Sequence, residues 1–399
     1  MNVLFWVNAF PTVSETFIRD QVVAVKGQGV DVRVYCSLGK DREAMVALAG
    51  FEASYLLSRT FDETDVLPST WRRRKLLVYL IVFFSVFKGH YRYYRKALTK
   101  KRHAAYPKAY QLFFQVHFVL KHKIDVIHAH FGNNGLQAAV LKELGLPVKL
   151  ITTFHGYDVR LGLREGGGLY KPLIKAVDTV VAISDYNRKC LVDFGFSESK
   201  IVDLPNGIDV AFFKKEKVDR DAGVVRVLTV ARLEKEKALH LGIEAFAALV
   251  KAFPERRFEY TIIGTGSLQK ELLDLVVALK LDGHVRFVGA KSTVGVKAAM
   301  NASDIFMLTS IAEVLPTVLL EAQACELPVL ATGVGSVKAM VADGIVVPAN
   351  DLNALSLGLQ RLIHCEPEWG KMGVAGRQFV KAHYDMGLVN KKLIALYNA

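Results

Sequence analysis

Short runs of apolar residues alternate along the chain with longer stretches in which apolar residues recur every three or four positions. In the first half, the short runs are residues 2–7, 30–37, 124–131, 148–156, 178–184 and 200–210. Runs of this length are typical of buried strands, and the stretch 15–27 between the first two has the periodicity of an amphipathic helix. The alternation predicts an α/β domain built on a parallel sheet.

A second series of the same kind follows a charged and polar stretch, "EKVDRDAG" at residues 216–223. Its strand-like runs are residues 225–231, 258–266, 285–290, 304–310 and 328–333. Its helical stretches are residues 239–253, 267–281 and a segment that begins near Pro316. A chain of 399 residues fits two domains better than one. The expected division is a first domain over 1–210, a linker over 211–224, a second domain over 225–375, and a C-terminal helix over 376–399 that packs back toward the first domain.

Two open α/β domains of similar size also predict where a ligand binds. In sheets of this kind, ligands bind just outside the carboxyl ends of the parallel strands. We therefore expect two Rossmann-like domains that face each other across a cleft lined by their strand ends. Residues that directly follow each strand-like run are the first candidates for binding and catalysis.

Composition favours a protein of the cytoplasm. Hydrophobic residues make up 51% of the chain, enough to bury large cores. The four cysteines, Cys36, Cys190, Cys325 and Cys365, lie far apart without C-x-x-C spacing, which is typical of reduced thiols. The first residues have no basic region and no small-residue cleavage site, so a signal peptide is not expected.

The net charge of +13 is concentrated in one interval. Between Asp65 and Asp125 there are fourteen Lys and Arg and no acidic residue, so this interval carries +14 and the rest of the chain −1. It also holds an apolar run from Leu76 to Phe87, which is too short to span a bilayer. Basic residues that flank apolar and aromatic ones suit a helix lying in the interface of an anionic membrane.

We therefore expect the segment at about 66–124 to face the membrane, which would place the protein peripherally at the inner face. The basic residues expected to contact lipid are Arg72, Arg73, Arg74, Lys75, Arg92, Arg95 and Lys96. One alternative is a core helix followed by a solvated basic face. Nucleic acid is another, but no recognition motif accompanies the basic residues, so no nucleic-acid partner is expected.

The stretch "EVLPTVLLE" places Glu313 and Glu321 eight residues apart, before and within the helix that begins near Pro316. The free amides of Thr317, Val318 and Leu319 at such a helix N-terminus suit a phosphate group. Glu321 lies about 7 Å beyond Pro316 along the axis. A diphosphate at the helix tip would then have one carboxylate near each attached sugar. Paired, buried salt bridges are the alternative explanation of such glutamates.

Two further strand ends of the second half carry residues suited to the same ligand. Arg232 and Lys237 follow the run 225–231, and both can stabilise a diphosphate leaving group without a metal. The alternative is a solvated helix start, with Glu234 and Glu236 as their partners. Gly264 and Gly266 follow the run 258–266, where the backbone could approach a nucleotide closely.

These motifs, in this order and spacing, resemble the donor domain of retaining glycosyltransferases of the GT-B fold, the large family 4. The matching segments are "ARLEKEKA", "IIGTGSL", "MNASDIFMLTS" and the E-x7-E of Glu313 and Glu321, over roughly residues 225 to 335. The resemblance implies that Arg232 and Lys237 hold the donor diphosphate. It also implies that Glu313 contacts hydroxyls of the transferred sugar and that Glu321 contacts the nucleotide ribose.

The first half is similar to a bacterial subgroup of this family that builds exopolysaccharide, capsule or related surface glycans. The similarity lies in "FPTVSETFIRDQV", "HAHFG" and "TFHGYDV". It implies that His155 lies beside the reacting sugar as a catalytic residue. The residues expected on the acceptor side are Ser14, Glu15, His130 and Asp158. His128 and His130 share the setting of His155, and a structural role for one or both is the alternative.

The sequence departs from the family pattern in the sugar pocket and on the far side of the donor domain. Val314 stands where glycine usually follows the first glutamate, which narrows the expected pocket. Lys338 and Ala339 replace a Pro-Glu pair, while Gly335 is kept. Ala231 and Ala238 are mild replacements of glycine.

The resemblance as a whole implies a retaining, metal-independent hexosyltransferase. It would use a UDP- or GDP-linked sugar as the donor substrate, need no cofactor, and act on a lipid-linked or oligosaccharide acceptor in surface polysaccharide biosynthesis. Two alternatives remain open from the sequence, a sugar-nucleotide epimerase of the same fold and a non-catalytic scaffold at the membrane. Neither the nucleotide base nor the sugar follows from the residues.

Overall fold

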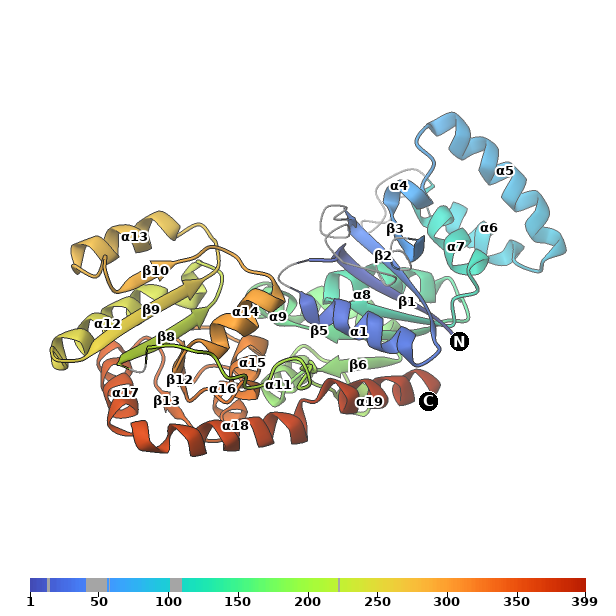
Figure 1. Cartoon of the computed structure of the whole chain (residues 1–399). Helices are drawn as coiled ribbons and strands as arrows, with labels where there is room; N and C mark the ends of the chain where they lie inside the picture. The colour runs from blue at the N-terminus through green and yellow to red at the C-terminus, as the bar shows by residue number, and fades with distance from the viewer. Residues whose placement is uncertain (13–14, 41–55, 57, 101–109, 222) are drawn as a thin grey trace. The chain divides into compact units, whose positions relative to one another are not determined.

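The computed structural model describes residues 1–399 except 13–14, 41–55, 57, 101–109 and 222. The described chain divides into two compact units, which Figure 1 shows in colours that follow the sequence. Unit 1 comprises Met1–Leu204 together with Asn390–Ala399, and unit 2 comprises Pro205–Val389. Each is a parallel-sheet α/β domain, so the predicted α/β class with two Rossmann-like domains is confirmed.

In its described part, unit 1 holds a seven-stranded parallel sheet in the order β3-β2-β1-β4-β5-β6-β7. The strands are β1 (Asn2–Phe10), β2 (Asp31–Lys40), β3 (Thr60–Asp62), β4 (Val126–His130), β5 (Lys149–Phe154), β6 (Thr179–Ala182) and β7 (Ile201–Asp203). Every residue of β4 and β6 is buried, as expected for parallel strands covered by helices on both faces. The order reverses between β1 and β4, which pair directly with Val3 opposite Val126.

The helices of unit 1 connect these strands. They are α1 (Thr16–Gly27), α4 (Glu63–Val66), α5 (Trp71–Phe87), α6 (Tyr91–Thr99), α7 (Gln111–Lys121), α8 (Gly132–Glu143), α9 (Gly156–Glu165), α10 (Lys171–Ala176) and α11 (Asp185–Asp193). The sequence predicts a helix start near Asp185, and α11 begins there because the Ser184 hydroxyl accepts a hydrogen bond from the Asn187 amide. Among the described residues, no helix combines the length and apolar character needed to cross a bilayer.

The described part of unit 2 holds a six-stranded parallel sheet in the order β10-β9-β8-β11-β12-β13. Its strands are β8 (Val224–Val230), β9 (Arg257–Ile263), β10 (Val285–Phe287), β11 (Ile305–Leu308), β12 (Val329–Thr332) and β13 (Ile345–Val347). Its helices are α12 (Leu239–Ala252), α13 (Gln269–Ala278), α14 (Thr293–Asn301), α15 (Thr317–Ala324), α16 (Val337–Met340), α17 (Leu352–His364) and α18 (Trp369–His383). The chain ends with α19 (Met386–Asn398), which continues into unit 1.

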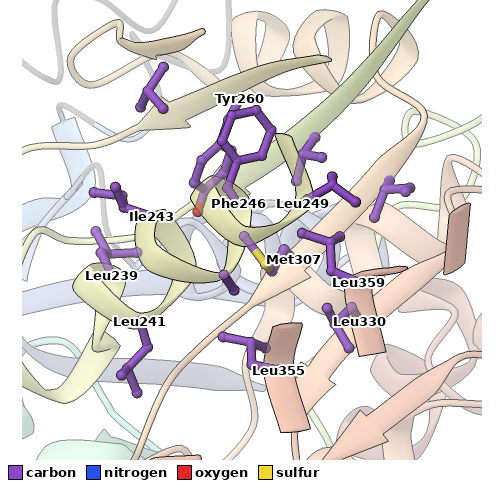
Figure 2. Close-up of a cluster of buried hydrophobic side chains, with 14 of the residues drawn as sticks. Leu239, Leu241, Ile243, Phe246, Leu249, Tyr260, Met307, Leu330, Leu355 and Leu359 are labelled. Carbon is purple, nitrogen blue, oxygen red and sulfur yellow. The ribbon is translucent and has the colours of Figure 1, made fainter. Parts of the chain in front are cut away.

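The core of unit 2 lies between its sheet and the helices α12 and α17, as Figure 2 shows. Ile243, Phe246 and Leu249 of α12 are fully buried at the i, i+3 and i+6 positions. Each such side chain contributes about 1.5–3 kcal/mol when removed from water. The Tyr260 hydroxyl in this core lies 2.8 Å from the Thr229 hydroxyl, so its polar atom is satisfied. This core holds the ends of β8 and β11 in place, and those ends carry the candidate site.

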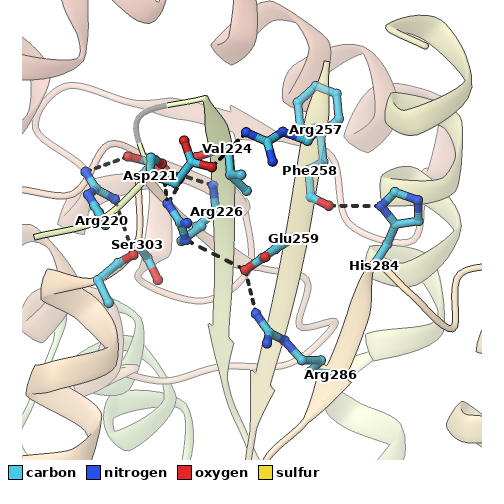
Figure 3. Close-up of polar contacts among 12 residues, drawn as sticks. Arg220, Asp221, Val224, Arg226, Arg257, Phe258, Glu259, His284, Arg286 and Ser303 are labelled. Atoms are coloured by element: carbon cyan, nitrogen blue, oxygen red, sulfur yellow. Dashed lines mark hydrogen bonds and ion pairs between the residues drawn. The ribbon is translucent and has the colours of Figure 1, made fainter. Parts of the chain in front are cut away.

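The segment predicted as a linker, 211–224, falls in unit 2 when the chain is divided into two units. Figure 3 shows the contacts that attach its second half to the amino ends of β8 and β9. Arg220 forms an ion pair of 2.7 Å with Asp304, and Asp221 forms one of 2.7 Å with Arg257. The Arg226 guanidinium also donates to the Asp221 carbonyl. Residues 214–221 are exposed, as the polar composition predicts, and the ion pairs of Arg220 and Asp221 connect the segment to unit 2.

The C-terminal segment, predicted as one helix, forms the two helices α18 and α19. The break lies at Tyr384 and Asp385, where the backbone pairs with Ile208 instead of continuing the helix. The Ile208 amide donates to the Tyr384 carbonyl at 2.7 Å, and the Met386 amide donates to the Ile208 carbonyl at 2.9 Å. In unit 1, the Lys149 ammonium donates to the Leu396 carbonyl near the end of α19.

Candidate active site

Lys237 and Glu313 form an ion pair just beyond the carboxyl ends of two neighbouring strands of unit 2, β8 and β11. Lys237 Nζ lies 2.5 Å from Glu313 Oε1, and the Ser310 hydroxyl donates to the same oxygen at 2.7 Å. The side chains are 17% and 9% exposed. The structure thus brings together two residues that the sequence places in one site, 76 positions apart.

Backbone contacts fix the two loops that carry this pair. The Thr309 hydroxyl donates to the Lys237 carbonyl at 2.8 Å, and the Ile311 amide donates to the Glu236 carbonyl at 2.9 Å. Sequence reasoning missed Thr309 and Ser310, although both are polar residues directly after a buried strand. That position was the available signal, because strand ends are where ligand sites form in such sheets.

Arg232 is more loosely held than Lys237. Its guanidinium pairs with Glu236 at 2.7 Å, and its side chain is 55% exposed. An exposed pair of this kind is worth only about 0.2–1 kcal/mol, so Arg232 can exchange its partner at little cost. Glu234, the other expected partner, instead accepts from the amide and hydroxyl of Ser267.

Gly264 and Gly266 let the loop after β9 pack directly on the loop after β8. Gly264 has φ +141°, and a Cβ there would lie 1.9 Å from the Ala231 carbonyl oxygen. A Cβ on Gly266 would lie 2.4 Å from the Leu233 carbonyl oxygen. Both positions therefore require glycine because of the chain's own backbone. Close approach of a nucleotide at these glycines stays a prediction.

Helix α15 begins at Thr317, next to Pro316, as predicted. Pro316 is its N-cap residue, and the Leu319 amide donates to the Pro316 carbonyl at 3.1 Å. Of the three amides expected to bind phosphate, Leu319 is therefore engaged within the helix, which leaves Thr317 and Val318 at the first two positions. Those positions lack an acceptor in the preceding turn of the helix. Glu321 lies one turn further along α15 and is half-buried.

The loop after β12 supports Glu313 and Val314 from the other side. Gly335 has φ +54°, and a Cβ there would lie 1.9 Å from the Glu313 carbonyl oxygen. The Ser336 hydroxyl donates to the Val314 carbonyl. The Val314 side chain is itself buried. Gly335 therefore has a structural reason to be glycine, and it acts on the backbone that carries Glu313.

Three histidines lie together at the carboxyl ends of β4 and β5 in unit 1. His128 and His130 share one face of β4, and His155 follows β5. The rings of His130 and His155 stack with centroids 5.3 Å apart, and His130 Nδ1 lies 3.1 Å from His155 Nε2. Burial lowers the pKa of His130 to about 3 and that of His155 well below its usual range. The imidazoles are therefore neutral near pH 7.

His128 is a structural member of this cluster. Its Nδ1 lies 2.7 Å from the Tyr397 hydroxyl of α19, and its Nε2 lies 2.7 Å from the Thr153 hydroxyl. Both ring nitrogens are thus engaged, and the first of these contacts fixes the end of α19 on unit 1. No local signal points to Tyr397, which is 269 positions away.

His130 and His155 differ from His128 in that each keeps one nitrogen without a partner. Within the described residues, His130 Nε2 and His155 Nδ1 are buried and make no hydrogen bond. Glu15 Oε2 is in the same condition, and burial raises the pKa of Glu15 to about 7. Phe17, two residues on, contacts the His155 ring. Each of these atoms can bond to a hydroxyl of a ligand or to water.

Asp158 holds the loop around His155 in place. One of its carboxylate oxygens accepts from the amides of His155 and Val159, and the other accepts from the Gly132 amide. Burial raises the pKa of Asp158 to about 6, although these hydrogen bonds oppose the shift. Both oxygens are engaged by the backbone, so the direct role of Asp158 is to shape the loop. Ser14, also expected on the acceptor side, lies outside the described residues.

Comparison with known proteins shows the family to which the chain belongs. The model of Glycosyltransferase Family 4 matches residues 14–212, and that of Glycosyl transferases group 1 matches residues 211–379. WcaL of Escherichia coli (strain K12), named for colanic acid biosynthesis, is 28% identical over 417 residues and covers 100% of both chains. WcaL of Salmonella typhimurium (strain LT2) is 32% identical, over 68% of this chain and 70% of its own.

A third relative and a solved structure extend the comparison. The amylovoran biosynthesis glycosyltransferase AmsK of Erwinia amylovora is 28% identical over 98% of both chains. The crystal structure of HepE from Anabaena in complex with UDP matches all of this chain and all of its own, with a TM-score of 0.73 and 17% identity. That likeness shows the GT-B fold. With matches to both family models and this identity to WcaL, the chain belongs to the family 4 glycosyltransferases.

Proposed function

We propose that this glycosyltransferase moves a hexosyl unit from a nucleotide-diphosphate sugar to a lipid-linked glycan in exopolysaccharide biosynthesis. The role in exopolysaccharide biosynthesis is suggested by the relatives, which are named for the synthesis of colanic acid and amylovoran. The lipid link of the acceptor rests on the membrane association proposed below. The donor is proposed to be UDP- or GDP-linked, and HepE, which binds UDP, supports the UDP-linked class. Retention of configuration and independence from a metal are part of the same proposal.

The observation that carries the proposal is the Lys237–Glu313 ion pair in front of α15. A diphosphate at the amides of Thr317 and Val318 would compete with Glu313 for the Lys237 ammonium. The carboxylate of Glu313, released in part from Lys237, could then accept hydrogen bonds from sugar hydroxyls. Binding of the diphosphate would thus make both Lys237 and Glu313 available to contact the donor.

The same residues can supply the electrostatic part of the chemistry. As the bond between the sugar and the diphosphate breaks, negative charge grows on the leaving phosphate. A fixed ammonium and helix amides stabilise that charge more than they stabilise the ground state. Arg232 adds a second cation when it leaves Glu236. Glu321, one turn further along α15, would contact the ribose.

In unit 1, we propose that the neutral imidazole of His155 contacts a hydroxyl of the reacting sugar. His155 Nδ1 is buried without a partner in the described part of the chain, which supports this role. His130 and Glu15 would complete the acceptor side, since each also has an unpartnered polar atom. A neutral cluster suits an uncharged hydroxyl better than a phosphate, because burying a charge there is costly.

We also propose that the protein acts peripherally at the inner face of the membrane, where a lipid-linked acceptor is within reach. The support is the interval between Asp65 and Asp125, residues 66–124, which carries fourteen basic residues and no acidic one. Positive charge of this density attracts anionic lipid headgroups.

The donor proposal is tested by thermal unfolding with a panel of UDP-, GDP- and ADP-sugars. One nucleotide class should raise the unfolding temperature, and the rise should disappear in K237M and E321A. Transfer is then followed with the labelled sugar and a lipid extract. Conversion of the labelled donor without any acceptor would show an epimerase instead. Nucleotide binding that survives E321A and R232A unchanged would contradict the proposed site.

A further inference from the structure

Helix α5 of unit 1 presents its apolar side chains outward. Nine large apolar residues of this 17-residue helix are exposed, and its buried residues are Val78 and Ser85. Phe87 is 79% exposed and Tyr79 65%. The exposed apolar residues are Trp71, Leu76, Leu77, Tyr79, Leu80, Phe83, Phe84, Val86 and Phe87. A helix of a water-soluble domain normally turns such residues toward the core.

The exposed residues form one broad face. The helix meets unit 1 through a narrow stripe that includes Arg74, Val78 and Ser85, which follow each other at four and seven positions. At about 100° per residue, the apolar residues from Leu76 to Phe87 cover an arc of roughly 180° on the opposite side. Figure 1 shows α5 at the outer end of unit 1, joined to the domain by α6. In the described part of unit 1, the side chains of this apolar face are therefore exposed from Leu76 to Phe87.

Helix α6 fixes α5 to the domain and carries positive charge itself. Its buried side is Tyr93, Tyr94 and Ala97. The Tyr94 ring contacts Phe113 of α7 at 4.9 Å, and its hydroxyl lies 3.0 Å from His117 Nδ1. Arg92 and Arg95 lie on the exposed side. The apolar surface of α5 and the basic surface of α6 thus belong to two helices that adjoin each other.

Basic residues stand at both ends of the apolar face. Arg72, Arg73 and Lys75 precede it and are exposed, and Lys88 follows it directly. A charge is costly at the centre of a bilayer, so both ends favour the headgroup level. Seventeen residues span about 25 Å, less than the hydrocarbon thickness of about 30 Å. The helix can therefore lie along one leaflet with its apolar face downward.

We propose that α5 immerses this face in the acyl-chain region of one leaflet of an anionic membrane. This rests on the membrane association proposed above and names how the contact is made. The charges at its ends and on α6 stay among the headgroups, where anionic lipids neutralise them. The attachment therefore has an apolar component that salt does not remove.

The same charges disfavour a second copy of the chain as the occupant. Whether two α5 helices paired in parallel or antiparallel fashion, basic ends would meet basic ends. The sequence from 66 to 124 offers no carboxylate to neutralise them. An anionic membrane supplies both the negative charge that these basic residues need and an apolar phase for the exposed face. A second α5 helix supplies no negative charge.

Flotation of the full chain on vesicles tests this inference. The vesicles contain either about 30 mol % phosphatidylglycerol in phosphatidylcholine or phosphatidylcholine alone. The parent should bind the anionic vesicles and keep part of that binding at about 0.5 M salt. F83S/F84S/F87S should lose about tenfold or more in partitioning at both salt concentrations. R72Q/R73Q/K75Q should lose mainly the binding at low salt.

A matched control replaces exposed apolar residues elsewhere. V277S/L357S removes two exposed side chains of unit 2 and should bind vesicles like the parent. Depth is measured with F84W in a W71F/W369F background, by quenching with lipids brominated in the acyl chains. Strong quenching is expected. Parent-like flotation of F83S/F84S/F87S overturns the inference, and so does quenching of the introduced indole by soluble iodide alone.

Two readouts separate this inference from neighbouring explanations. Sedimentation equilibrium of the parent that shows a dimer, lost in F83S/F84S/F87S and without any flotation, assigns α5 to a second copy and overturns the inference. Thermal shift with the nucleotide sugar should be unchanged in F83S/F84S/F87S. If F83S/F84S/F87S binds the nucleotide sugar and also floats like the parent, the immersion of α5 is wrong while the proposed transferase stands. Absence of nucleotide-sugar binding in the parent defeats the proposed transferase instead.

Discussion

The polar clusters of the two units occupy equivalent places, at the carboxyl ends of parallel strands, but they treat charge in opposite ways. Unit 2 keeps a charged pair, with Lys237 against Glu313 at 2.5 Å. Unit 1 keeps its imidazoles neutral, because burial lowers the pKa of His130 to about 3. A site that retains charge suits a charged ligand, and a site that expels charge suits a hydroxyl. This contrast supports the proposals made above, a diphosphate in unit 2 and a sugar hydroxyl at His155 in unit 1.

The two clusters are also supported differently. In unit 2, glycine positions bring loops into direct backbone contact, as where Gly335 meets the Glu313 carbonyl. In unit 1, a side chain does this work, because the Asp158 carboxylate collects three backbone amides. The first arrangement fails when a Cβ is added, and the second fails when an oxygen is replaced. Mutations can test each form of support separately.

The largest expected effect is on the charged pair. K237M keeps the unbranched shape and most of the length of the side chain but removes the ammonium and leaves Glu313 without its cation. Removal of one preorganised group at a developing charge lowers turnover by about 10²- to 10³-fold. The measurement is kcat/KM for sugar transfer, with K235M as the matched control because Lys235 is an exposed neighbour in the same short helix. A K237M enzyme within about threefold of the parent would contradict the role of Lys237.

The next effect concerns the glycine support of unit 2. G335A places a Cβ 1.9 Å from the Glu313 carbonyl oxygen in a left-handed conformation, so the backbone under Glu313 must move. We expect the free energy of unfolding to fall by about 2 kcal/mol or more, with weaker donor binding. G283A is the control, because a Cβ there meets nothing within 4 Å and its φ is not left-handed. Equal stability of the two variants would show that the loop after β12 adapts freely.

A smaller effect is expected from the support of unit 1. D158N turns one acceptor oxygen into a donor that faces a backbone amide. One hydrogen bond is lost and one buried group is left unpaired, which costs about 1–3 kcal/mol. Chemical denaturation followed through Trp6, which is fully buried in unit 1, reports the change when Trp71 and Trp369 are replaced by Phe. No change in the midpoint would mean that the amides find other acceptors.

Much of this architecture follows from local pattern. The apolar runs predict most strands, because a parallel strand buried on both faces is apolar along its whole length. Pro316 marks the start of α15, the helix that carries Glu321. Asp185 marks a helix start, since Ser184 before it is an effective cap. In each case the cause lies within a few neighbouring residues.

The remaining features depend on contacts between distant segments. The break between α18 and α19 arises because Ile208 pairs with the backbone at Asp385, which no local signal indicates. Tyr397 contacts His128, which lies 269 positions earlier in the chain. The residues of α5 predict an apolar helix, but only its tertiary attachment through Val78 and Ser85 shows that the apolar face points outward. The periodicity of apolar residues shows that a helix has an apolar face, but tertiary packing determines whether that face is buried.

The last and smallest effect is a pH dependence that separates the two units. His130 has a folded pKa of about 3, below its usual value of 6.5, so the unfolded chain binds its proton first. Stability is therefore complete above about pH 6.5 and is lost as the pH falls toward 3. H130Q removes this titration, and we expect the loss of unit 1 stability between pH 7 and pH 5 to shrink by about 1–2 kcal/mol.

Asp158 gives the opposite sign, because its folded pKa of about 6 exceeds its usual 3.8 and protonation relieves the cost of a buried charge. In D158N the loss between the same two pH values should therefore grow, by about 1 kcal/mol. Unfolding followed through Trp6 at both pH values measures the two slopes together. Slopes that change in the same direction in H130Q and D158N would contradict the opposite pKa shifts of His130 and Asp158.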